Sequence, residues 1–215
     1  MQTEITELVN KAKQINQNVL KRAFDIYFSV LLFLLVFVWL FPILAILIKL
    51  NSRGKVFFIQ NRIGLNGTIF KCYKFRTLPQ KEVEEEDKFL TGDNIPATAV
   101  GKWLRRLNID ELPQFINVLK GEMSIVGPRP HAIAYHNKYA GYIHNINDRL
   151  LVRPGITGLA QIKGFRGDVA NEEINKERTI KRVAFDILYI YHWSFINDLK
   201  IVLITFFQML GIGKE

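Results

Sequence analysis

The segment from Ile26 to Ile48 reads IYFSVLLFLLVFVWLFPILAILI and contains no charged residue. With a helical rise of about 1.5 Å per residue, it is long enough to cover the roughly 30 Å hydrocarbon core of a bilayer. It is too long for the apolar part of a cleaved signal peptide, and a polar helical pattern precedes it. The sequence therefore predicts a membrane helix around which the rest of the chain is organised.

Basic residues flank this run on both sides: Lys21, Arg22, Lys49, Arg53 and Lys55. Because positive residues favour the cytoplasmic side, both ends prefer the same side of the membrane. Pro42 lies inside the run, where it removes a helical hydrogen bond and crowds the preceding turn. A helix broken at Pro42 would enter and leave through one leaflet. A single spanning helix with a tolerated proline kink is the alternative.

Two further features lie at the N-terminal end of the apolar run. Apolar residues follow a helical stripe through residues 1–20, which predicts an amphipathic helix that lies on the bilayer or packs on the globular domain. Asp25 is spaced to pair with Lys21 or Arg22, or else it is a solvated acid at the level of the headgroups.

The composition narrows the class of partner. The chain has 215 residues and a formal charge of +9, which suits nucleic acid, an anionic membrane surface or phosphorylated substrates. Cys72 is the single cysteine, so an internal disulfide is impossible and a reducing compartment is expected. Its alternating apolar surroundings indicate packing.

The remaining pattern predicts a mainly α fold with a short β-hairpin. Residues 56–60 and 68–75 read as strands, and 98–107, 112–119 and 172–193 read as helices. The apolar stretch 199–210 is too short to span, so it is expected to dock on the membrane or on the core. The acidic run Gln80–Lys88 is interpreted as a solvated face.

The run Asn108-Ile109-Asp110-Glu111-Leu112-Pro113-Gln114 carries the chemistry. Two adjacent acids near Arg105 suggest work on a phosphate, because acids can attack phosphorus or hold a divalent cation and arginines hold anionic oxygens. The local pattern equally allows Asp110 or Asn108 to be only the N-cap of the next helix.

Further basic residues lie at strand ends and rigid turns. Lys74 and Arg76 end the second predicted strand, Arg129 lies in a Gly-Pro-Arg-Pro turn, and Arg153 opens an Arg-Pro-Gly turn. Each is a candidate phosphate contact, although a solvated edge strand would explain the first pair. The four histidines lack the close helical pairing of zinc sites.

Taken in order, these motifs resemble one family. They are Lys21-Arg22 with Asp25, the proline-containing apolar run, Gln60 to Gly64, Lys74 to Thr77, Leu104 to Arg106, Asp110 to Gln114, Met123 to Pro130, Arg153 to Gly158 and Asp198 to Ile201. The chain resembles the bacterial sugar transferases, the monotopic polyprenyl-phosphate phosphoglycosyl transferases, from about Leu20 onward. The resemblance is to the minimal members, without the extra N-terminal membrane helices of larger relatives.

The resemblance implies an enzyme that moves a phospho-sugar from a UDP-sugar to undecaprenyl phosphate, releases UMP and uses Mg²⁺. After the amphipathic helix that the stripe predicts over residues 1–20, it implies a re-entrant membrane helix over 21–50 and a cytoplasmic catalytic domain with interfacial helices over 51–215. Its location would be the cytoplasmic face of the bacterial inner membrane, in O-antigen, capsule, exopolysaccharide or glycoprotein synthesis. Membrane lipids are expected partners, nucleic acid is not, and a homodimer is left open.

The resemblance also assigns roles. Asp110 matches the attacking carboxylate, and Glu111 matches its partner acid, both close to Mg²⁺. Arg105 and Arg129 match arginines that hold phosphates, while Lys74 and Asp186 match positions that look structural. Arg166 comes one place later than the family arginine, because Phe165 follows Gly164, and it is expected to serve in its place.

Two other classes compete with the transferase. A membrane-anchored nucleic-acid or lipid-binding module would use the basic charge without needing adjacent acids. An inactive scaffold would keep only the fold.

Overall fold

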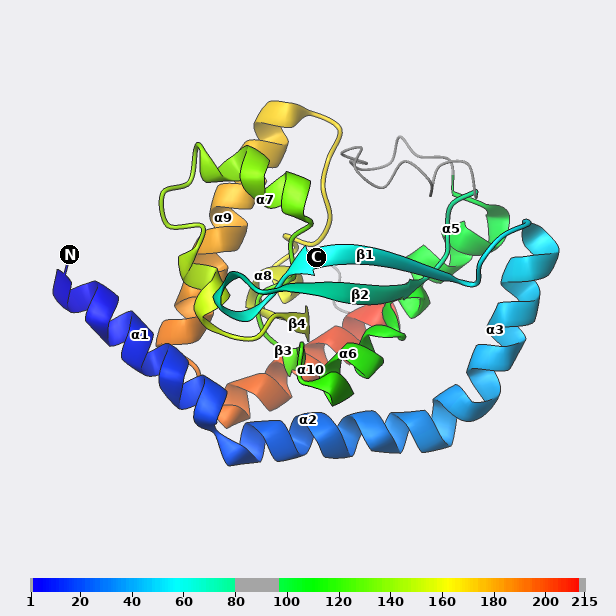
Figure 1. Cartoon of the computed structure of the whole chain (residues 1–215), viewed down its shortest axis with the longest axis horizontal. Coiled ribbons are helices and arrows are strands. Elements are labelled where there is room, and N and C mark those ends of the chain that lie inside the picture. Colours follow the sequence, from blue (N-terminus) through cyan, green and yellow to red (C-terminus); the bar gives the residue numbers. More distant parts are fainter. Residues whose placement is uncertain (1, 80–96, 213–215) are drawn as a thin grey trace.

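Most of the chain is helical, and two short two-stranded sheets complete the fold (Figure 1). The computed structural model describes residues 2–79 and 97–212. The acidic run Gln80–Lys88 therefore lies outside the described residues.

The apolar segment forms one long helix. It consists of α2 (Val19–Leu32), a π-helical turn (Phe33–Phe37) and α3 (Val38–Asn51). Within the described part of the chain, it is the one helix long and apolar enough to cross a membrane. Only 17% of its most apolar window is buried, unlike the core helix of a soluble protein.

The long helix changes direction between α2 and α3 (Figure 1). Pro42 lies inside α3, and the helical conformation continues through it. The irregular backbone is the turn Phe33–Phe37, where the Val38 amide bonds the Phe33 carbonyl. The sequence placed the break at Pro42 itself, whereas this irregular turn precedes the proline. The physical reason is that a proline ring crowds the turn before it, and π-bulges are a recognised cause of kinks.

The predicted hairpin is confirmed. β1 (Phe57–Ile63) pairs antiparallel with β2 (Ile69–Phe75). Cys72 on β2 is buried in the main core, as the packing interpretation expected. A second, parallel pair, β3 (Ser124–Val126) with β4 (Gly155–Thr157), was not predicted from the sequence.

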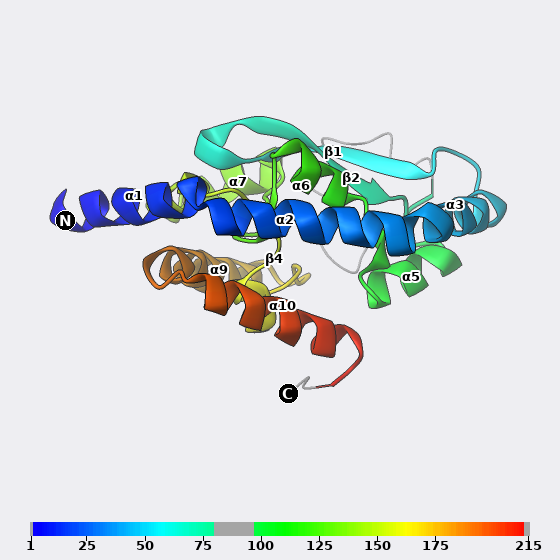
Figure 2. The same ribbon diagram turned by 90° about the horizontal axis from the view of Figure 1, so that it is seen from below.

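The four predicted helices outside the apolar segment are present as α1 (Gln2–Gln17), α5 (Ala99–Arg106), α6 (Gln114–Lys120) and α9 (Glu172–Tyr191). The apolar stretch 199–210 lies largely in α10 (Phe195–Met209). Two short helices, α7 (Ile133–Ala140) and α8 (Leu159–Ile162), were not predicted. In Figure 2, α1 and α2 run across the molecule, with the hairpin on one side and α9 and α10 on the other.

The N-terminal helix packs on the globular domain. Leu8, Ala12 and Ile15 are buried in the main core, and α1 contacts α9. Asn18 ends this helix and caps α2, because its side chain accepts a hydrogen bond from the Lys21 amide. Of the two placements that the sequence allowed for α1, the structure has the packed one.

The last helix docks through one face only. Ile201 is buried, and the Thr205 hydroxyl bonds the Thr157 hydroxyl at the end of β4. Large apolar side chains of α10 remain exposed: Ile196, Leu199, Leu203, Ile204, Phe206 and Phe207.

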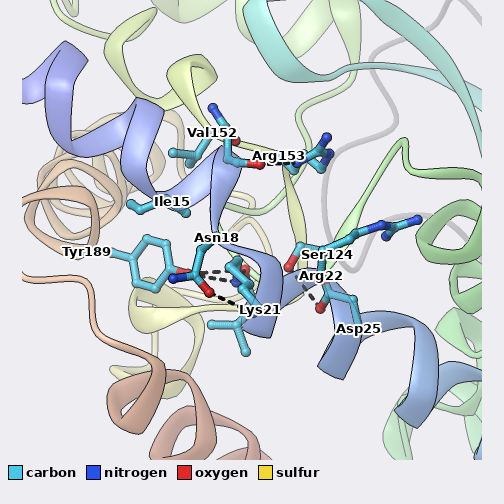
Figure 3. A pocket seen from close by; sticks show the side chains of 11 residues that line it. Ile15, Asn18, Lys21, Arg22, Asp25, Ser124, Val152, Arg153 and Tyr189 are labelled. Carbon is cyan, nitrogen blue, oxygen red and sulfur yellow. Dashed lines mark hydrogen bonds between the residues drawn. The ribbon is translucent and has the colours of Figure 1, made fainter.

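Buried polar contacts join the start of α2 to the domain. The Lys21 ammonium donates to Asp198 Oδ2 at 2.7 Å and to the Val126 carbonyl at 2.9 Å. Asp25 accepts from the Ser124 hydroxyl (Figure 3) and also from the Ile125 amide.

The predicted pairing of Asp25 with Lys21 or Arg22 is therefore wrong. Lys21 turns to Asp198, and Arg22 donates to the carbonyls of Val118 and Leu119. The physical reason is that buried polar groups take the partners that tertiary packing supplies, here on β3, α6 and α10, over neighbours on the same helix.

We expect Lys21→Met to lower the free energy of unfolding by about 3 kcal/mol, because it leaves the Asp198 carboxylate buried without its cation. Chemical denaturation in detergent micelles would measure the loss. Lys13→Met, at an exposed position on α1, is the matched control. Adding Asp198→Asn to Lys21→Met should recover part of the loss, and a further loss would contradict the ion-pair explanation.

Candidate active site

The two adjacent acids lie on a 3₁₀ turn, Ile109–Glu111, between α5 and α6. Asn108, just before the turn, adopts the left-handed conformation with φ of 56°, which asparagine tolerates better than most residues. No side chain caps α6, whose N-cap position is Pro113. The prediction that Asp110 or Asn108 caps this helix is therefore wrong, because the chain makes a separate turn before α6 begins.

Glu111 is the centre of a cluster of cations. It is 4% exposed, and its Oε1 lies 2.9 Å from Lys74 Nζ. Arg129 binds both carboxylate oxygens, with distances of 2.5 and 3.1 Å. Arg166 Nη2 donates to Oε2 at 2.6 Å. Three residues that the sequence singled out are thus brought together around one acid.

Each cation comes from a different element. Lys74 lies near the end of β2, Arg129 in the turn after β3, and Arg166 in the loop after α8. The turn after β3 depends on close backbone approach. A Cβ added at Gly155 would lie 2.1 Å from the Gly127 amide nitrogen, so only glycine allows β4 this close to the turn.

A second ion pair supports Arg129 from behind. Arg149 donates to the Arg129 carbonyl at 2.5 Å and to Asp186 Oδ2 at 2.8 Å. The side chains of Arg149 and Asp186 are almost fully buried. Asp186 was expected to be structural, whereas the sequence analysis missed Arg149. Arg149 lies in no recognisable motif, so the sequence does not indicate that it bonds the Arg129 carbonyl and Asp186.

The pKa values of the two acids move in opposite directions. Burial alone would raise the pKa of Glu111, but the charges of Arg129, Lys74 and Arg166 hold that pKa well below its ordinary value. Burial raises the pKa of Asp110 above its ordinary value, and the charge of Glu111 raises it further, while Lys74 opposes the rise. Glu111 is therefore held in its ionised form, whereas burial disfavours the ionised form of Asp110.

Asp110 is also the less restrained of the two acids. It is 9% exposed, and none of the described cations lies within ion-pair distance of its carboxylate. A carboxylate that is poorly solvated and held by no direct ion pair is better suited to attack than one bound by three cations.

Three predicted phosphate contacts lie outside the Glu111 cluster. Arg105 Nε donates to the Thr77 hydroxyl at 2.9 Å, on the helix that leads into the acidic turn. Arg76 is 2% exposed and donates to the carbonyls of Ser52, Arg53 and Lys55.

Arg153 likewise donates to backbone, to the carbonyls of Gly121 and Asn16. Arg76 and Arg153 therefore have structural contacts where the sequence predicted phosphate binding. The motif alone did not reveal this because an arginine can bond carbonyl oxygens as well as phosphate oxygens.

The two acids suit a Mg²⁺ ion that also binds substrate phosphates better than a metal ion whose ligands are all protein side chains. Among the described residues, no three His, Cys, Asp or Glu side chains gather into a metal site. Mg²⁺ usually binds one or two carboxylates together with substrate phosphates and water. Asp110 has oxygens free of described ion pairs, whereas both oxygens of Glu111 are already occupied by cations. The donor set therefore fits Mg²⁺ held first by Asp110.

The family model for bacterial sugar transferases matches residues 16–211. The chain belongs to this family. It is 48% identical, over 88% of its length, to a UDP-glucose:undecaprenyl-phosphate glucose-1-phosphate transferase of Escherichia coli K12. It is 43% identical, over 86% of its length, to a protein of the same name from Caulobacter vibrioides.

The relatives differ in length. The chain spans 40% of the Escherichia coli relative and 67% of the Caulobacter relative. It spans 98% of the exopolysaccharide production protein PSS of Rhizobium leguminosarum, to which it is 42% identical.

The two acids should respond oppositely to neutralisation at pH 7. We expect Glu111→Gln to lower the free energy of unfolding by about 3 kcal/mol, because it leaves three cations without their shared anion. Asp110→Asn should leave that free energy unchanged or raise it, since it removes a charge that burial disfavours. Chemical denaturation of both variants measures the difference.

The Glu111 effect has a defined pH dependence. Its folded pKa lies below the ordinary value of 4.5, so its contribution to stability is complete above that pH and is lost as the pH falls toward the folded pKa. The gap between the unaltered protein and Glu111→Gln should therefore narrow below pH 4.5. Equal losses for the two variants at pH 7 would refute the division between the acids.

Proposed function

We propose that this protein transfers a phospho-sugar from a UDP-sugar to undecaprenyl phosphate and releases UMP. The observation that carries the proposal is the pair of adjacent buried acids in opposite electrostatic settings, in a chain of the bacterial sugar transferase family. The names of its relatives supply the substrate class.

The reaction would proceed in two displacements. The Asp110 carboxylate attacks the β-phosphorus of the UDP-sugar, and the bond from that phosphorus to the UMP oxygen breaks, so UMP leaves with the electron pair. A phosphate oxygen of undecaprenyl phosphate then attacks the same phosphorus, and the acyl phosphate bond breaks to return the Asp110 carboxylate. A covalent carboxylate intermediate divides one difficult transfer into two easier ones.

The cations around Glu111 would serve the phosphates. Arg129 and Arg166 present guanidinium groups beside the attacking acid, and such groups bind phosphate oxygens in pairs. Glu111 keeps Lys74 and these arginines together when no substrate is bound. We infer that Arg105 on α5, which donates to the Thr77 hydroxyl in the absence of substrate, is a further phosphate contact.

Mg²⁺ held by Asp110, with Glu111 nearby, would offset the negative charge of the pyrophosphate. The chain's own part is to keep Glu111 ionised through its three cations and to hold Arg129 in place through Arg149 and Asp186.

The membrane segment would bring enzyme and lipid acceptor together. We propose that α2 and α3 enter and leave through the cytoplasmic leaflet of the bacterial inner membrane. The bend between them and the basic residues on both flanks support this. The exposed apolar side chains of α10 would lie at the same interface.

UDP-glucose is the first donor to test, because several relatives are named for it. A relative from Aeromonas hydrophila, 39% identical, is named for UDP-N-acetylgalactosamine, so N-acetylated sugars belong in the same panel. Two relatives named for exopolysaccharide production favour surface polysaccharide synthesis as the setting.

We expect Asp110→Asn to lower the rate of UMP release by at least about 10³-fold, because the attacking group is lost. The assay follows UMP with a panel of UDP-sugars, Mg²⁺ and undecaprenyl phosphate. Glu177→Gln, an exposed acid on α9, is the matched control. Undiminished turnover by Asp110→Asn would remove Asp110 from the nucleophile role, and failure of every donor would reject the proposed reaction.

Topology can be tested with single cysteines. In a Cys72→Ser background, Lys13→Cys and Lys55→Cys place thiols at exposed positions on the two sides of the apolar segment. A re-entrant helix predicts that an impermeant thiol reagent labels both only from the cytoplasmic side, as in inverted vesicles. Labelling of the two positions from opposite sides would establish a spanning helix instead.

A further inference from the structure

Arg166 is the most accessible of the three cations on Glu111. Its side chain is 29% exposed, against 18% for Arg129 and 15% for Lys74. It also lies on a loop, whereas Lys74 lies on a strand. Arg166 is therefore the cation most able to leave Glu111 for an incoming diphosphate. The orientation of its side chain depends on the contacts that hold the loop.

The loop has little regular structure to hold it. Gly164 and Gly167, on the two sides of Phe165-Arg166, both have positive φ, of 85° and 75°. These are conformations that glycine adopts freely, so the backbone alone does not fix the loop.

Arg178 Nη2 donates to the Gly164 carbonyl at 2.9 Å, at the start of the loop. Arg182 on α9 supplies the buried anchor on both sides of Arg166. Its Nε donates to the Phe165 carbonyl at 3.0 Å, and its Nη2 donates to the Gly167 carbonyl at 2.6 Å. These are the carbonyls immediately before and after Arg166. Nη2 also pairs with Asp168 Oδ1 at 3.2 Å.

The other side of the guanidinium is fixed to the core. Arg182 Nη1 donates to the Tyr135 hydroxyl at 3.0 Å, and that hydroxyl bonds Thr179. Arg182 itself is 3% exposed. A guanidinium spreads these bonds to two carbonyls and a hydroxyl over three nitrogens held in one plane, whereas a lysine would have to make them from a single nitrogen and a glutamine has only two N–H donors.

We propose that Arg182 is a positioning residue that holds the loop Gly164–Asp168 and so aims Arg166 at Glu111 and at the diphosphate of the donor. The role in turnover rests on the proposed function, whereas the anchoring of the loop does not. Arg182 has no described ion pair or hydrogen bond with Asp110 or Glu111, so it acts on them only through Arg166.

A double-mutant cycle tests the connection to turnover. We expect Arg182→Gln to lower kcat/KM for the UDP-sugar by about 10- to 100-fold, as small displacements of a positioned group do. In an Arg166→Ala background, Arg182→Gln should cause no further loss beyond twofold, by the logic of coupled residues. Arg182→Lys should recover only part of the activity. Losses that multiply in the double variant would overturn the proposal.

Hydrogen exchange tests the anchor without any activity. The amides of Phe165 and Val169 bond Ala160 and Asn175, so they should exchange slowly in the unaltered protein. Arg182→Gln or Arg182→Lys should speed exchange in peptides that cover residues 163–169 and leave α6 unchanged. Lys181→Gln, an exposed neighbour on α9, is the control.

The outcomes separate the two proposals. Unchanged exchange in residues 163–169 of both Arg182 variants would overturn the positioning role, whatever the activity. Faster exchange together with no turnover of any UDP-sugar by the unaltered protein would keep the anchor and reject the proposed reaction.

Discussion

The carboxylate of Glu111 is the interaction on which the site depends. It binds Lys74, Arg129 and Arg166, which come from β2, the turn after β3 and the loop after α8. Without this anion the three cations would repel one another in a poorly solvated space, and those segments would lose their common partner. The same contacts keep Glu111 charged. They leave its neighbour Asp110 without a described ion pair, so Asp110 is the acid that is free to react.

The membrane helix and the site are joined through β3. Asp25 accepts from the Ile125 amide, and Lys21 donates to the Val126 carbonyl. Gly127, the next residue, opens the turn that carries Arg129. The distance along the chain from the membrane contact to the cation beside the acids is therefore very short. In the proposed reaction, which brings a lipid acceptor to a water-soluble donor, such a connection would help, because small displacements of catalytic groups are costly.

Local patterns predicted the long apolar helix, the hairpin and the main helices, because each has a clear periodicity in the sequence. They also singled out Arg129 as a phosphate contact, and the family resemblance singled out Arg166; in the structure both bind Glu111. They failed where tertiary contacts decide. Asp25 bonds β3 instead of its helical neighbours, and Arg76 and Arg153 bond carbonyls. The parallel pair of β3 and β4 was missed because two three-residue strands have no periodicity of their own. Arg182 was missed because its partners, two loop carbonyls and the Tyr135 hydroxyl, come together only in the tertiary structure.

Covalent labelling of the protein by its donor tests the central claim most directly. The protein would be mixed with UDP-glucose and Mg²⁺ without undecaprenyl phosphate, quenched, digested and analysed by peptide mass spectrometry. The account predicts a phospho-sugar on the peptide that contains the acidic turn, with fragmentation placing it on Asp110, and loss of the adduct when undecaprenyl phosphate is added. An adduct on Glu111, or turnover with UMP released only after acceptor is added and no adduct at any stage, would contradict it.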